Sequence, residues 1–171
     1  SACVTFNQDV AYPQATKELH HEVELVVALK SGGKDISPDS AMDCVYGYAV
    51  GIDFTRRDLQ AIAKDKGRPW DVAKGFDQSA PISAILPASE VSQLSDAEIS
   101  LKVNGEKRQQ AQLSDMIWSV PEIICELSKF FELKPGDIIY TGTPSGVTAV
   151  IKGDRITASV AGIGSLDFKI V

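Results

Sequence analysis

Two glutamates two positions apart have the spacing of a metal-binding pair. Glu22 and Glu24 precede residues 25–29, an apolar run rich in β-branched side chains that predicts a buried strand. Alternate side chains of a strand share a face, so both carboxylates would lie together. Buried like charges repel and need a partner, and Lys17 is the only Lys or Arg within five positions. A hard divalent cation would resolve the conflict. The alternative is an edge strand with two solvated glutamates.

A third carboxylate, Asp53, ends the next predicted strand, residues 45–54. Gly47 and Gly51 interrupt this strand, and glycines there often permit close approach of another backbone or a ligand. Asp53 is an acid at the end of an apolar run, and the sequence pattern alone leaves open whether it lies near the two glutamates. The alternative is an N-cap or an Asx turn before the following helix.

Polar side chains follow along the chain. Residues 55–66 predict a short helix with Thr55 as its cap and Asp58 in capping-box position. Arg57 and Gln60 lie one turn apart on this helix, and Lys74 lies in a mixed segment, residues 70–76. Taken singly, each of these three side chains is most simply a solvated surface residue.

Thr143 lies in a Gly/Thr-rich turn, residues 141–146, directly after a predicted strand over residues 138–140. The turn is not a phosphate-binding P-loop, because it lacks the Lys-Ser/Thr pair and a following helix. Either it is a tight turn, or its hydroxyl and backbone N–H groups point into a site, as strand ends often do.

Composition excludes several classes of protein. The chain has 171 residues, 44% hydrophobic and 23% charged, as expected for one globular domain with a sizeable core. Its net charge of −6 argues against binding to nucleic acid or an acidic membrane. No apolar stretch is long enough to span a membrane, and no signal peptide is visible. Three scattered cysteines predict reduced thiols in a cytoplasmic protein.

The remaining pattern predicts many short strands and few helices. Residues 98–103 and 106–112 form a hairpin around Asn104-Gly105, a type I′ signal. Ser119 and Glu122 form a capping box that opens a helix ending at Phe131. Further strands are expected at residues 82–86, 154–161 and 165–171. This is a β-rich α+β domain.

Taken together, the motifs resemble the fumarylacetoacetate hydrolase family, in its small acylpyruvase and oxaloacetate decarboxylase branch. The matching stretches are LHHEVEL (19–25), YAVGIDFTRRDLQ (48–60), KGRPWDVAKGFDQSAP (66–81), LKVNGEKRQ (101–109) and SKFFELKPGDIIYTGTPSGV (128–147). The resemblance covers the chain from about residue 19 onward.

The resemblance implies a mixed β-roll, a homodimer, and one divalent metal, Mg²⁺ or Mn²⁺, with Ca²⁺ as a third option. It makes Glu22, Glu24 and Asp53 the metal ligands. It places Arg57, Gln60, Lys74 and Thr143 around a small 2-oxo acid substrate, with Lys74 and Gln60 in catalytic roles. Residues 1–171 are then a single catalytic domain.

The implied reaction is cleavage of a carbon–carbon bond through a metal-stabilised enolate, by acylpyruvate hydrolysis or oxaloacetate decarboxylation. Small family members also carry an upstream lid with the pattern N-Y-x-x-H-x-x-E, which supplies the base for hydrolysis, and this motif is not found in the sequence. We therefore expect an N-terminal lid segment to be either lacking from this domain or missing from this sequence. A keto–enol tautomerase or isomerase and a catalytically silent metal-binding domain stay open.

Overall fold

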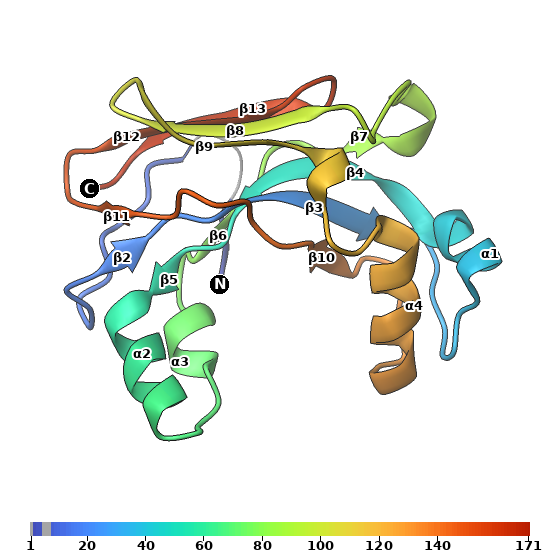
Figure 1. The fold of residues 1–171 in the computed structure, drawn as a ribbon, viewed down its shortest axis with the longest axis horizontal. Coiled ribbons are helices and arrows are strands. Elements are labelled where there is room, and N and C mark those ends of the chain that lie inside the picture. The colour runs from blue at the N-terminus through green and yellow to red at the C-terminus, as the bar shows by residue number, and fades with distance from the viewer. Residues whose placement is uncertain (1, 5–7) are drawn as a thin grey trace.

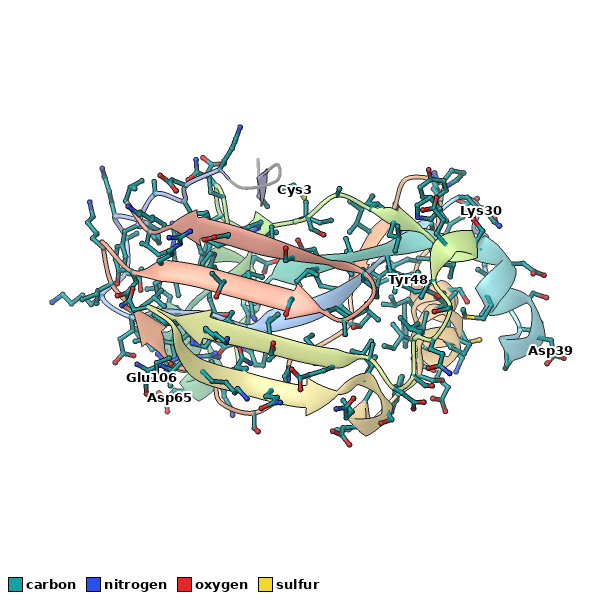
Figure 2. The ribbon with its side chains drawn as sticks, turned by 90° about the horizontal axis from the view of Figure 1, so that it is seen from above. Cys3, Lys30, Asp39, Tyr48, Asp65 and Glu106 are labelled. Atoms are coloured by element: carbon teal, nitrogen blue, oxygen red, sulfur yellow. The ribbon has the colours of Figure 1, made fainter. Side chains whose placement is uncertain are left out.

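Two four-stranded antiparallel sheets stacked over one core form the body of the molecule (Figure 1). The computed structural model describes residues 2–4 and 8–171. The lower sheet has the strand order β10-β3-β4-β7, which are Ile138–Tyr140, Val23–Leu29, Val45–Ile52 and Leu86–Pro87. The upper sheet has the order β13-β12-β8-β9, which are Gly164–Lys169, Arg155–Val160, Glu98–Val103 and Glu106–Gln112. Figure 2 looks onto this upper sheet, with Glu106 near one end of the molecule and Asp39 near the other.

Smaller elements surround the two sheets. A third sheet has the order β11-β2-β5, formed by Ala149–Val150, Leu19–His20 and Thr55–Arg56, and β1 (Cys3–Val4) pairs in parallel with β6 (Ala80–Pro81). The α-helices are α1 (Pro38–Ala41), α2 (Arg57–Asp65), α3 (Asp71–Lys74) and α4 (Val120–Phe130). Single 3₁₀ turns cover Met42–Cys44, Ala88–Glu90 and Leu113–Asp115. Helices α2 and α3 lie below one end of the sheets and α4 below the other (Figure 1). The expectation of a β-rich α+β domain is confirmed.

Strand periodicity explains where the core sits. Strands β8 and β12 bury every second residue, as expected when one face of a sheet meets the core and the other meets solvent. All seven residues of β3 are buried, which requires that both faces of this strand, inner in its sheet between β4 and β10, be covered. Phe54 and Phe168 meet edge to face, with ring centroids 6.2 Å apart. In the described part of the chain no helix is long and apolar enough to cross a membrane.

Two local predictions are confirmed. Asn104 and Gly105 adopt φ of 53° and 83°, the left-handed values of a type I′ hairpin turn. The capping box is present at α4, where Glu122 accepts from both the backbone N–H and the hydroxyl of Ser119. The expected end of the helix is one residue late, because α4 ends at Phe130 and Phe131 is 62% exposed.

The strand expected over residues 82–86 is wrong. Strand β6 ends at Pro81 and β7 begins at Leu86, so within this range Leu86 pairs with Tyr48, Ile82 forms an isolated bridge to Gly51, and residues 83–85 are in no strand. The reason lies at Ser83, whose hydroxyl accepts from the N–H of Val50 at 2.9 Å in place of a backbone carbonyl. A side chain that takes over a ladder hydrogen bond diverts the backbone from the sheet.

Candidate active site

The paired glutamates lie at the junction between two sheets. Glu22 lies in the break between β2 and β3, and Glu24 is the second residue of β3. They are 8% and 4% exposed, and β3 is flanked by strands on both sides, so the solvated edge-strand alternative is wrong. One oxygen from each of Glu22, Glu24 and Asp53 lies within 4.8 Å of the others. The structure therefore brings the three predicted ligands together.

Antiparallel pairing of β3 with β4 delivers Asp53 to this point. Glu24 stands opposite Gly51, and the chain leaving β4 lets the N–H of Asp53 donate to the carbonyl of Glu22 at 2.8 Å. Asp53 is not an N-cap, because α2 begins four residues later. The expected close approach at Gly51 is confirmed, since a Cβ there would lie 2.5 Å from the ring of Tyr140.

Lys74 is not a free surface lysine. Its Nζ lies 2.7 Å from Oε2 of Glu22 and 2.6 Å from Oδ2 of Asp53. Burial lowers the pKa of Lys74, but the hydrogen bonds to Asp53 and Glu22 outweigh it and hold the pKa above its ordinary value. Lys74 is therefore a fixed ammonium between two of the carboxylates.

Arg57 and Gln60 line the same side of the cluster from α2. The guanidinium of Arg57 donates to Oε1 of Glu22, and its Nη1 donates to Oε1 of Gln60 at 2.5 Å. The predicted start of this helix is wrong, because Thr55 belongs to β5 and α2 begins at Arg57. Asp58 does not form the capping box, since its carboxylate accepts from the N–H of Lys17 at 2.9 Å.

Burial and neighbouring charges shift the pKa values of the three carboxylates in different directions. Burial raises the pKa of Glu24 to about 7, and the nearby charges of Asp53 and Glu22 add to the rise. Burial also raises the pKa of Asp53, against the hydrogen bond from Lys74. At Glu22 burial acts in the same direction, but hydrogen bonds from Lys74 and Arg57 overcome it and lower the pKa. Three carboxylates face two cationic side chains, which leaves the cluster room for more positive charge.

The turn after β10 reaches the cluster through its backbone. The N–H of Gly142 donates to Oε2 of Glu24 at 2.7 Å, and Thr143 is the next residue. The hydroxyl of Thr143 accepts from Nε2 of Gln109 at 2.8 Å. The candidate Thr143 is thus one residue from a direct contact with the carboxylates.

Sequence reasoning missed Gln109 and the role of His21. Both are buried, at 1% and 0% exposed, and Nδ1 of His21 lies 2.8 Å from Oε1 of Gln109. Strand β9 has the sequence EKRQQAQ, which carries no apolar alternation that would mark one position as buried. The sequence contains the adjacent pair His20 and His21, but no local pattern indicated that His21 faces β9.

An open cavity of about 610 Å³ shares the turn with the carboxylate cluster. Its walls include Thr141, Gly142 and Thr143 on one side and the largely apolar side chains of Leu113, Met116, Trp118 and Ile123 on the other. Asp115 is the only charged residue among the described residues that line it.

The donor set fits a hard divalent cation. All three converging groups are carboxylates, and Mg²⁺, Mn²⁺ and Ca²⁺ prefer oxygen ligands. Two of the three are buried, where an uncompensated negative charge is costly. Glu22, Glu24 and Asp53 can therefore hold such an ion.

Comparison with known proteins gives consistent matches. The model of the fumarylacetoacetate (FAA) hydrolase C-terminal family matches residues 1–171. A fumarylpyruvate hydrolase from Ralstonia sp is 46% identical over 161 residues, covering 94% of this chain and 83% of that protein. A mitochondrial oxaloacetate tautomerase from Bos taurus is 45% identical, covering 94% and 73%. The crystal structure of fumarylpyruvate hydrolase from Pseudomonas aeruginosa in complex with Mn²⁺ and pyruvate superposes with a TM-score of 0.97 and 47% identity, covering 99% of this chain and 75% of that one.

Proposed function

The chain belongs to the fumarylacetoacetate hydrolase C-terminal family, and from this premise we propose that it is a divalent-metal-dependent enzyme that cleaves a carbon–carbon bond in a 2-oxo acid. The substrate class is an acylpyruvate, cleaved by hydrolysis, or oxaloacetate, cleaved by decarboxylation. The observation that carries the proposal is the cluster itself, in which Glu22, Glu24 and Asp53 converge within 4.8 Å and Lys74 bridges two of them. A purely structural metal site would not need the additional lysine, arginine and glutamine.

The three carboxylates would hold Mg²⁺ or Mn²⁺, with Ca²⁺ as a third option. Mn²⁺ is supported by the Pseudomonas aeruginosa relative, whose structure contains it together with pyruvate. When bound, the ion supplies Lewis acidity that stabilises negative charge developing on the 2-oxo oxygen. The negative balance of the cluster supports a cation there.

The neighbouring side chains bind and orient the substrate. Within residues 2–4 and 8–171, Arg57 uses three of its five N–H donors on His20, Gln60 and Glu22, and the other two can reach a substrate carboxylate. Lys74 stays protonated and places a positive charge beside the developing oxyanion. Gln60 hydrogen-bonds the reacting group, and Thr143 hydrogen-bonds the carboxylate end.

The cavity beside Thr143 suits the acyl part of an acylpyruvate. It shares Thr141, Gly142 and Thr143 with the carboxylate cluster, and the wall that includes Met116, Trp118 and Ile123 is largely apolar. Burial of each methylene against such walls contributes about 0.8 kcal/mol. Longer acyl chains should therefore bind more tightly, until the cavity is full.

Tautomerisation of oxaloacetate is a second candidate for the same residues. It is favoured by the Bos taurus relative, an oxaloacetate tautomerase that is 45% identical over 161 residues. This reaction moves a proton between carbon and oxygen and breaks no carbon–carbon bond. The remaining alternative is a catalytically silent metal-binding domain.

The test is turnover of acetylpyruvate and of oxaloacetate by chelator-treated protein, before and after Mg²⁺ or Mn²⁺ is restored. Metal-dependent release of pyruvate from either substrate supports bond cleavage. Loss of the enol absorbance of oxaloacetate without release of pyruvate or carbon dioxide selects the tautomerase. Tight metal binding with no reaction of either substrate selects the silent domain.

We also propose that the protein is a cytoplasmic homodimer. Exposed apolar side chains at Ile117, Trp118, Phe130 and Phe131 provide surface that a second copy could cover. The free thiols of Cys3, Cys44 and Cys125 agree with a reducing compartment. Sedimentation equilibrium would decide the number of subunits.

A further inference from the structure

We propose that Gln109 is a positioning residue that makes Thr143 a hydrogen-bond donor toward a carboxylate oxygen of the substrate. The inference rests on the proposed function, because it names the role of one side chain in binding the 2-oxo acid. It is carried by a buried chain of hydrogen bonds from His21 through Gln109 to Thr143.

Two backbone groups determine the orientation of the Gln109 amide. The N–H of Val23 can only donate, and it lies 3.2 Å from Oε1 of Gln109. The carbonyl of Pro144 can only accept, and it lies 2.8 Å from Nε2. A flipped amide would place donor against donor and acceptor against acceptor. Nε2 must therefore face Thr143.

His21 forms a hydrogen bond with the oxygen of the same amide. Since Oε1 of Gln109 is an acceptor, Nδ1 of His21 carries the hydrogen that joins them at 2.8 Å. In the neutral imidazole Nε2 is then an acceptor, and it lies 3.0 Å from the hydroxyl of Thr148. Every polar atom of Gln109 has a partner and its side chain is 1% exposed, so the amide has one low-energy position.

The fixed amide of Gln109 determines which hydrogen bonds the hydroxyl of Thr143 can form. Its Oγ1 accepts from Nε2 of Gln109 at 2.8 Å, which occupies a lone pair and leaves the hydroxyl proton. In the part of the chain that the structure describes, Thr143 Oγ1 donates no hydrogen bond. The next residue back, Gly142, donates its N–H to Glu24. The proton of Thr143 is thus available in the wall of the cavity, one residue from the contact between Gly142 and Glu24.

A donor at this place matches an anionic ligand. Hydrogen bonds to a carboxylate are stronger than those between neutral groups, whereas a lone pair presented to it would repel. Without Gln109, the hydroxyl could rotate and donate to the carbonyl of Pro144 or to water. Thr143 would then lose its fixed orientation without losing its hydroxyl.

The experiment is a double-mutant cycle of Gln109→Met and Thr143→Val, measured in the metal-loaded protein by oxo-acid turnover and by calorimetric binding of pyruvate. We expect each single variant to raise KM and the pyruvate Kd by about tenfold, with kcat changed much less, because the contact is made in ground state and transition state alike. In the Thr143→Val background, Gln109→Met should add nothing further. Thr143→Ser, which keeps the hydroxyl, should retain binding.

Ser128→Ala is the matched control. Ser128 is also fully buried, accepts from the N–H of Ile36 at 2.9 Å and donates to the carbonyl of Cys125 at 2.8 Å. It should lower Tm without changing KM or Kd. If Gln109→Met behaves like Ser128→Ala, or if the effects of the two site variants multiply in the double variant, Gln109 does not act through Thr143 and the inference is overturned.

The pyruvate measurement separates this inference from the proposed function. A wild-type protein that turns over neither oxo acid but binds pyruvate, with the cycle behaving as expected, contradicts the enzyme and supports the inference. Turnover of an oxo acid with no coupling between Gln109 and Thr143 supports the enzyme and contradicts the inference. Absence of pyruvate binding by the metal-loaded wild type overturns the inference directly.

Discussion

The Nζ of Lys74 lies 2.6 Å from Oδ2 of Asp53, although the two residues belong to different elements and are 21 positions apart. The same ammonium reaches Glu22, 52 positions away, at 2.7 Å. One cation therefore couples two of the three carboxylates that can hold a metal. Under the proposed function, this ammonium would stabilise the oxyanion that develops on the substrate.

Lys74→Met should lower kcat by about a hundredfold or more, the usual loss when one preorganised electrostatic group is removed. The fold should survive, since the side chain is only partly buried. Affinity for Mn²⁺ should stay the same or rise, because a competing cation is removed. Lys64→Met, an exposed lysine on the neighbouring α2, serves as the control. Unchanged kcat in Lys74→Met would contradict the role.

Asp53→Asn should abolish metal-dependent turnover and weaken Mn²⁺ binding by at least about tenfold, because a neutral amide replaces an anionic ligand. Titration calorimetry with Mn²⁺ and thermal unfolding with and without the ion measure this. Wild-type Tm should rise with added Mn²⁺, since an ion that binds only the folded state stabilises it. Asp65→Asn, on an exposed residue, should leave both quantities as in the wild type. Equal Mn²⁺ affinity in Asp53→Asn and wild type would remove Asp53 from the ligand set.

Gly51→Ala should destabilise the protein by about 1–3 kcal/mol, as overpacking of a filled core does. A Cβ there would lie 2.5 Å from both Cε1 of Tyr140 and Cγ2 of Val26. Denaturant unfolding gives the free energy. Gly164→Ala is matched, because the nearest atom to its added Cβ is 3.5 Å away, and it should change stability little. A Gly51→Ala variant as stable as the wild type would mean that β4 tolerates the methyl group.

Asp58 predicts a pH dependence of stability. Its slight burial raises the pKa, but hydrogen bonds from the N–H of Lys17 and the hydroxyl of Thr16 outweigh this and lower it. A folded-state pKa below the unfolded value contributes stability above the unfolded pKa, roughly pH 4, and this contribution is lost as the pH falls further. The stability difference between wild type and Asp58→Asn should therefore shrink below about pH 4. A difference that grows in acid would reverse the sign and refute the assignment.

Local patterns were sufficient for the elements whose causes are local. The turn at Asn104-Gly105 and the capping box at Ser119 each depend on a few adjacent residues, and both are present. Local patterns failed to predict the structure where a group distant in sequence formed the hydrogen bond instead. Asp58 has capping-box spacing, yet Thr16 and Lys17 take its carboxylate, and Ser83 replaces a strand hydrogen bond.

By itself, the sequence determined that two glutamates lead into a core strand, that Asp53 ends the next one, and that the family motifs are present in order. These statements need only strand periodicity and residue type. The tertiary structure alone decided that Lys74 lies between Glu22 and Asp53, and that Gln109 is buried against His21. Such contacts join residues from separate elements, and they depend on how the sheets stack and how the chain returns. Because no period in the local sequence encodes a distance across the fold, the chemistry of the site became visible only when the chain was folded.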